Sequence, residues 1–167
     1  MVKMRVDYSK ELDKCEEFGE IFELVKRAVK EVLGRRRVGL MLFLADLPVH
    51  VGAYHGLGSN SIVLNRRFLE AVRDSAKSRR EINSYIFLVL LHEYLHSLGY
   101  TDELEVRRLS LKVVGGAFGG EHPLAQMALK GSASLLSKLN LRRALNLKPE
   151  SPKLIKDFEK ISQPYIQ

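Results

Sequence analysis

Residues 81–102 read EINSYIFLVLLHEYLHSLGYTD, an apolar stretch that ends in the pattern H-E-x-x-H-x-x-G-x-x-D. The apolar residues before the pattern recur at the spacing of a buried helix face. Residues four apart share one face of a helix, so the imidazoles of His92 and His96 can converge on one metal ion. Glu93 lies beside them as a possible general base. The sequence therefore predicts a central helix that binds zinc (Zn2+) through His92 and His96, with Glu93 as the catalytic residue.

A sharp turn is expected directly after this helix. Gly99 follows the last apolar helical residue, Leu98. Glycine readily adopts the left-handed conformation that ends helices. Such a turn can bring Asp102 back toward the metal as a third ligand.

The pattern resembles that of the metzincin metalloproteases, a branch of the zincin-type zinc proteases. The resemblance covers residues 92–102 and implies that His92 and His96 are zinc ligands, with Glu93 as the base. It places Gly99 at the turn and Asp102 where most members carry a third histidine.

The third ligand has alternatives. Thr101 is a good N-cap for a helix running to about residue 114, and the acids after it suit the first turn of such a helix. In a gluzincin-like variant of the site, the third ligand comes from this second helix, with Glu105 the better candidate and Glu103 next. His122 is a further candidate, since the motif defines only two ligands.

The same residues also resemble a second family, the rRNA-maturation endoribonuclease-like metalloproteins, which carry H-G-x-L-H-x-x-G-Y-D-H. The shared positions are Leu95, His96, Gly99 and Tyr100. The chain departs from that family at Glu93, where the family has glycine, and at Asp102, where it has histidine. A glutamate beside the first ligand is what peptide hydrolysis requires, so the departure favours a peptidase.

The rest of the chain predicts an α/β (α+β) fold, zincin-like, with a small mixed sheet packed against the central metal-binding helix and further helices around it. Periodicity and turn residues predict a helix over 10–33 ended by Gly34, strands at 37–45, 49–55 and 61–65, and a helix over 67–76. The glycines of 56–60 suit a hairpin. In zincins an edge strand beside the active-site helix binds the substrate, and here 49–55 and 61–65 are the candidates.

Several side chains outside the motif have possible roles. Tyr54 or Tyr100 could stabilise the oxyanion, and the sequence does not choose between them. His50 and His55 lie on opposite faces of their strand, so at most one points toward the metal. Met127 is either the methionine beneath the zinc of metzincins or, more simply, a core residue.

Length and composition indicate one soluble domain. The chain has 167 residues, 46% hydrophobic and 28% charged, and a single cysteine, Cys15, which permits no internal disulfide. We expect a catalytic domain over 1–148 and a basic tail or short helix over 149–167. The absence of a signal-like N-terminus or a long uncharged run predicts a cytoplasmic protein without membrane contact.

The charge is uneven. The net charge is +7, and residues 35–80 hold nine Lys and Arg against three acids. Such a segment suits a nucleic-acid partner, or it is a solvated basic surface paired with the acidic N-terminal helix.

The expected function is that of a zinc metalloprotease, a hydrolase that cleaves peptide bonds with a zinc-activated water and Glu93 as general base. One alternative is a metal-dependent single-strand endoribonuclease that uses the same site. The other is a non-enzymatic protein with a structural zinc. The substrate-binding residues and the oligomeric state do not follow from the sequence.

Overall fold

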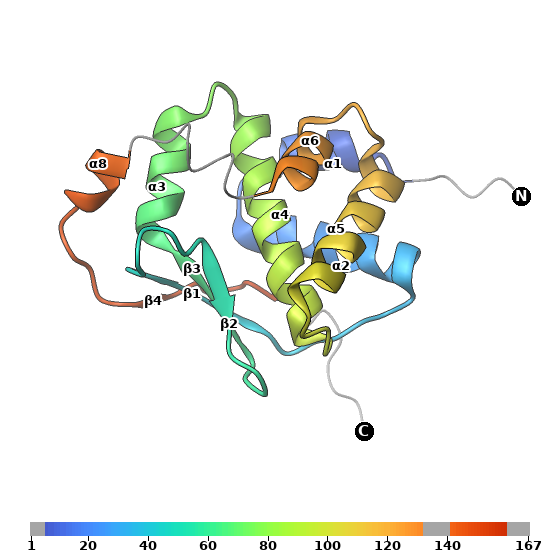
Figure 1. Cartoon of the computed structure of the whole chain (residues 1–167), viewed down its shortest axis with the longest axis horizontal. Helices are drawn as coiled ribbons and strands as arrows, with labels where there is room; N and C mark the ends of the chain where they lie inside the picture. Colours follow the sequence, from blue (N-terminus) through green and yellow to red (C-terminus); the bar gives the residue numbers. More distant parts are fainter. Residues whose placement is uncertain (1–5, 132–140, 160–167) are drawn as a thin grey trace, which may run out of the picture.

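The computed structural model describes residues 6–131 and 141–159 and has a mixed α/β architecture (Figure 1). The elements in chain order are α1 (Tyr8–Lys14), α2 (Phe18–Leu33), β1 (Met41–Ala45), β2 (Ala53–His55), β3 (Ser61–Asn65), α3 (Arg66–Ser75), α4 (Arg79–Ser97), α5 (Glu103–Phe118), α6 (Pro123–Lys130), α8 (Leu141–Leu145) and β4 (Lys153–Leu154). The predicted order of helix, small sheet and motif helix is confirmed.

Helix α4 carries the motif and runs through the middle of the molecule (Figure 1). It begins where the Ser78 hydroxyl accepts a hydrogen bond from the Glu81 amide at 3.2 Å. It packs against α2, α5 and α6 on one side and against β2 and β3 on the other. Leu90, Leu91 and Leu95 are fully buried, so the helix is the centre of the core.

The sheet has the strand order β2-β3-β1-β4, with β1 parallel to β3 and both outer pairs antiparallel. Strand β3 coincides with the predicted 61–65. The predicted 49–55 shortens to β2, because the Asn65 side chain donates hydrogen bonds to the carbonyl groups of Leu47, Pro48 and Val51 and so shapes this segment into a bend. Of the two candidate edge strands, β2 lies at the edge and β3 lies inside the sheet.

The two faces of the sheet differ. Leu42, Ile62 and Leu64 are buried on the face that the helices cover. Strand alternation puts Phe43 and Tyr54 on the opposite face, through their pairing with Val63. Strand β2 therefore borders α4 through Ala53 and His55, not through Tyr54.

The predicted helix over 10–33 is wrong in one respect, because it is two helices with a break at residues 15–17. The Asn83 side chain, on α4, donates hydrogen bonds to the Leu12 and Cys15 carbonyl groups at 2.8 and 3.0 Å. These bonds satisfy the free carbonyl end of α1. The predicted end at Gly34 is confirmed, with the left-handed φ of 69°.

Part of the segment after residue 148 joins the sheet. Within residues 149–159, where a basic tail or short helix over 149–167 was predicted, Lys153 and Leu154 form β4 beside β1. Phe158 then stacks on Phe22 of α2 with ring centroids 4.3 Å apart, and both rings are buried. Residues 160–167 lie outside the described residues.

No described helix combines the length and the apolar character needed to span a membrane.

Candidate metal centre

The two motif histidines converge on one point. Their Nε2 atoms are 3.2 Å apart, and the rings cross at 74° with centroids 4.8 Å apart. They lie one turn apart on α4, as the spacing predicts. Two imidazoles thus present the same ring nitrogen to the same small volume.

Glu103, the first residue of α5, completes this group. Its two carboxylate oxygens lie 3.0 Å from His92 Nε2 and 2.8 Å from His96 Nε2. Helix α5 buries a stripe that includes Val106, Ser110 and Val113. Glu103 lies one turn before Val106 on the same side of α5, where its carboxylate reaches the two histidines although its side chain is 71% exposed.

The donor set fits zinc. Two ligand atoms about 2.1 Å from a tetrahedral zinc ion lie about 3.4 Å from each other. The three separations here are 2.8, 3.0 and 3.2 Å, so the group would have to open by only about half an ångström. Two nitrogens and a carboxylate with one open position also match the donor types of catalytic zinc sites.

The hydrogen bonding supports the same conclusion. His96 Nδ1 lies 2.8 Å from the Tyr100 carbonyl oxygen, a group that can only accept, so Nδ1 carries a proton. In a neutral His96 the Nε2 atom is then a lone-pair acceptor that lies 2.8 Å from a carboxylate oxygen of Glu103. Two acceptors can lie this close only with a proton or a metal ion between them.

Burial also favours the ligand form of His92. Burial lowers the pKa of His92 from its ordinary value of 6.5, and the Glu103 carboxylate only partly offsets this effect. The shift favours the neutral form of His92. A neutral imidazole is the form that binds a metal.

Glu93 is almost fully buried beside the cluster, with 6% of its surface exposed. Its pKa is raised to about 7, mainly by burial; the nearby His96 opposes this shift and the charge of Glu103 adds to it. This carboxyl group is enclosed by the protein and follows His92 directly, but it is not part of the group of His92, His96 and Glu103. This is the environment expected of a general base.

Asp102 and Glu105 do not join the group formed by His92, His96 and Glu103. Asp102 is the N-cap of α5, and its Oδ1 accepts a hydrogen bond from the Leu104 amide at 3.2 Å. The cap was expected one residue earlier, at Thr101. Glu105 is exposed on α5 and is not part of the group. The structure thus brings Glu103, ranked behind Asp102 and Glu105 from the sequence, to the two histidines.

The turn between the two helices allows this arrangement. Gly99 has a left-handed φ of 104°, as predicted, and the Tyr100 amide bonds back to the Leu95 carbonyl oxygen at 3.3 Å. The chain then reverses within a few residues and starts α5 beside the end of α4.

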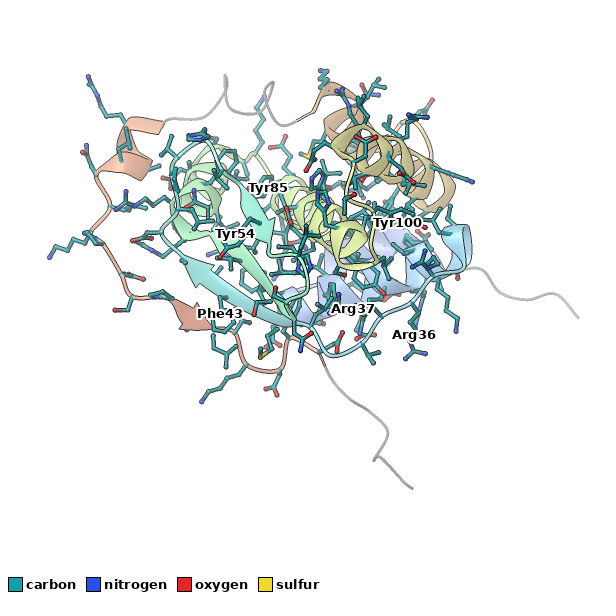
Figure 2. All side chains as sticks on the ribbon, turned by 60° about the horizontal axis from the view of Figure 1, so that its bottom comes forward. Arg36, Arg37, Phe43, Tyr54, Tyr85 and Tyr100 are labelled. Atoms are coloured by element: carbon teal, nitrogen blue, oxygen red, sulfur yellow. The ribbon has the colours of Figure 1, made fainter. Side chains whose placement is uncertain are left out.

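The hydroxyl groups of the two tyrosines considered for the oxyanion have other surroundings. The Tyr100 hydroxyl accepts a hydrogen bond from Arg35 Nη1 at 3.1 Å. Tyr54 is half exposed on the face of the sheet opposite to α4 (Figure 2). Tyr85, in contrast, lies on α4 under β2, where its hydroxyl is buried next to Gly52.

The remaining histidines are outside the group of ligand atoms. His122 is buried, caps α6 by accepting from the Leu124 amide at 3.1 Å, and packs on Phe118. His50 is exposed in the bend before β2. His55 faces the helix side of the sheet and makes a 3.0 Å contact from Nδ1 to the Ser61 carbonyl oxygen. Met127 is half-buried within α6.

The basic segment 35–80 is largely engaged within the chain. Carboxylates pair with Arg66, Arg67, Arg73, Arg79 and Arg80, and main-chain carbonyl groups bind Arg35 and Arg37. The partners of Arg79 and Arg80 are Glu16 and Asp13, which lie near the N-terminal helices. This agrees with the expectation of a basic surface paired with acidic N-terminal residues.

No protein-family model, curated protein or solved structure matches this chain. The function therefore has to be inferred from the site itself.

Proposed function

We propose that this chain is a zinc-dependent metallopeptidase in which His92, His96 and Glu103 hold the metal and Glu93 is the general base. The observation that carries the proposal is the convergence of two imidazoles and a carboxylate from the next helix within hydrogen-bonding distance of one another. Zinc at such a site, when bound, lowers the pKa of a water molecule and polarises a carbonyl group.

Glu93 performs the proton transfers. It takes a proton from the water that attacks the peptide carbonyl carbon, and it delivers this proton to the amine nitrogen as the C–N bond breaks. Its burial favours both steps, because a carboxylate partly deprived of water is a stronger base than an exposed one. The adjacent position in the motif keeps Glu93 beside the ligands without making it one of them.

Strand β2 is the proposed substrate strand. Strand β2 pairs with β3 along one edge, and no described strand pairs with its other edge. The Asn65 amide donates to the Gly52 carbonyl oxygen at 2.9 Å, and antiparallel pairing alternates along the strand, so Tyr54 also bonds toward β3. The main-chain groups of Ala53 and His55 therefore point to the outer edge. An extended peptide can add there as a further strand, next to the helix that holds the metal ligands.

The endoribonuclease alternative lacks a comparable supporting observation. Phosphate binding would need free cations, and the guanidinium groups of segment 35–80 are mostly bound to carboxylates or carbonyl oxygens of the chain.

The test compares two substrates under the same conditions. The zinc-loaded chain is incubated with an unstructured protein and, separately, with single-stranded RNA, each with and without a chelator. The proposal expects cleavage of the protein into fragments with new N-termini. Oxygen from labelled water should appear in the new C-terminal carboxyl groups, and no RNA fragments should form. RNA cleavage with intact protein substrate would establish the alternative, and loss of fold on chelation without any cleavage would indicate a structural zinc.

A further inference from the structure

The linker between α2 and β1 carries three consecutive arginines, Arg35, Arg36 and Arg37, and two of them bind the end of α4. Arg35 Nη2 donates to the Leu98 carbonyl oxygen at 2.8 Å, and Arg37 Nη1 donates to the Ser97 carbonyl oxygen at 2.6 Å. Carbonyl groups at a helix end lack partners within the helix and carry its partial negative charge. Both guanidinium groups thus complete the end of the zinc-motif helix.

Arg37 has a second set of contacts, and these reach the sheet. Its Nη2 donates to the Ser59 carbonyl oxygen at 3.2 Å and to Asn60 Oδ1 at 3.0 Å. Both acceptors belong to the loop that joins β2 to β3. One planar guanidinium group therefore bridges the end of α4 and the β2–β3 hairpin.

The main chain of Arg37 is fixed to the motif as well. Its amide donates to the Tyr94 hydroxyl at 2.8 Å, and that hydroxyl can donate to the Arg37 carbonyl oxygen at 3.3 Å. Tyr94 follows Glu93 directly and is fully buried, with its ring edge against Phe22. The bridge thus begins at a rigid part of the zinc helix.

We propose that Arg37 is a positioning residue for substrate binding: it holds the β2–β3 hairpin, and with it the edge strand β2, in place beside the zinc-motif helix. This inference rests on the proposed function. A peptide bound along β2 reacts only if β2 keeps a fixed distance from the catalytic groups on α4. A misplacement of about one ångström lowers the reaction rate strongly. Within residues 6–131 and 141–159, Arg37 is the residue whose side chain donates hydrogen bonds both to the end of α4 and to the β2–β3 loop.

The neighbouring arginines provide matched controls. Arg36 is exposed and donates no hydrogen bond among the described residues, and Figure 2 shows its side chain extending from the linker away from the body. Arg35 binds the α4–α5 turn through Leu98 and Tyr100 and makes no contact with the hairpin among the hydrogen bonds found in the described part of the chain. The variants Arg36→Met and Arg35→Met therefore remove the same charge without cutting the bridge.

The experiment measures hairpin mobility and kinetics on the same zinc-loaded proteins. Arg37→Met is expected to speed amide hydrogen exchange in residues 53–60 about tenfold, as the loss of charge-assisted hydrogen bonds implies. For peptide cleavage, KM rises about tenfold and kcat changes little, because the loss affects binding at β2. Arg36→Met leaves all three quantities at the wild-type value, and Arg35→Met leaves the exchange of 53–60 unchanged.

Two further variants separate positioning from simple loss of stability. Asn60→Ala removes one of the two bonds from Arg37 to the loop and leaves those to the Ser59 and Ser97 carbonyl groups in place, so it is expected to raise KM about threefold with an unchanged melting temperature. Arg37→Lys keeps the charge, and it is expected to behave like Arg37→Met, because a single ammonium group cannot span both ends.

Unchanged exchange in residues 53–60 of Arg37→Met would overturn the proposal, as would an unchanged KM in a wild-type-like cleavage assay. A wild-type chain that binds zinc and cleaves no peptide would instead refute the proposed function and with it the substrate role of Arg37. The exchange data would then still decide whether Arg37 holds the hairpin.

Discussion

Glu103 and Asp102 are adjacent carboxylates with different expected effects on zinc affinity. Glu103→Gln removes the carboxylate that bridges the two histidines and preserves side-chain size. Asp102→Asn removes the neighbouring carboxylate and preserves the cap of α5, because Asn caps helices as well as Asp does. Each variant removes one negative charge, and the two positions are adjacent in the sequence.

The size of the effect follows from the number of ligands. Zinc binding to structural sites with four protein ligands has an apparent free energy of about 10 to 16 kcal/mol, or about 3 kcal/mol for each ligand. The proposed site has three candidate protein ligands among the described residues. Loss of Glu103 should therefore weaken zinc binding about 100-fold. Asp102→Asn should change zinc affinity by less than about threefold, since only a screened charge is lost.

The assay is a competition for zinc between the protein and a chromophoric chelator at pH 7, with circular dichroism as a check that both variants are folded. A 100-fold loss in Asp102→Asn with near wild-type affinity in Glu103→Gln would refute the geometric reasoning. The metzincin-like ligand set, with Asp102 as third ligand, would then be correct. Equal affinity in both variants would refute any role of either carboxylate.

Two further predictions concern the frame around the site. Asn65→Asp should lower the free energy of unfolding, measured by urea titration, by about 3 to 5 kcal/mol. The buried Asn65 amide donates to three carbonyl groups, and a carboxylate cannot donate to them. A loss below about 1 kcal/mol would contradict this reasoning. The hydrogen bond from Arg66, with smaller contributions from the Glu150 amide and the Arg66 and Arg67 charges, holds the pKa of Asp46 below its ordinary value of 3.8. A lowered pKa stabilises the fold above the unfolded value, so wild type should be more stable than Asp46→Asn by a constant amount from pH 5 to 7, and the difference should shrink as the pH falls below about 4. A difference that grows on acidification would contradict the assignment.

The motif helix and its surroundings could be predicted because their signals are local. The apolar spacing before His92, the left-handed glycine at 99 and the strand at 61–65 are each encoded within a few residues. The break between α1 and α2 could not be predicted, because it depends on Asn83, which is distant in sequence and bonds to the end of α1. The short strand β4 has no alternating pattern of its own, and its position depends on pairing with β1.

The third member of the metal group was ranked too low for a similar reason. The metzincin-like pattern placed Asp102 at the third-ligand position, and the alternative with an N-cap at Thr101 favoured Glu105 over Glu103. The structure shifts the cap to Asp102, and its carboxylate is then occupied by the Leu104 amide. A usable signal was present in the sequence: Glu103 shares a helical stripe with Val106 and Val113, whereas Glu105 does not.

The central claim is that a metal group with a separate glutamate base cleaves peptide bonds, and Glu93→Gln tests it most directly. Zinc content by elemental analysis and cleavage of an unstructured protein are measured on the same preparations of wild type and variant. The account predicts one zinc per chain in both, with cleavage by wild type and a loss of at least about 100-fold in the variant. Wild-type cleavage by Glu93→Gln, or loss of zinc from it, would contradict the role of Glu93 as a base that is not a ligand.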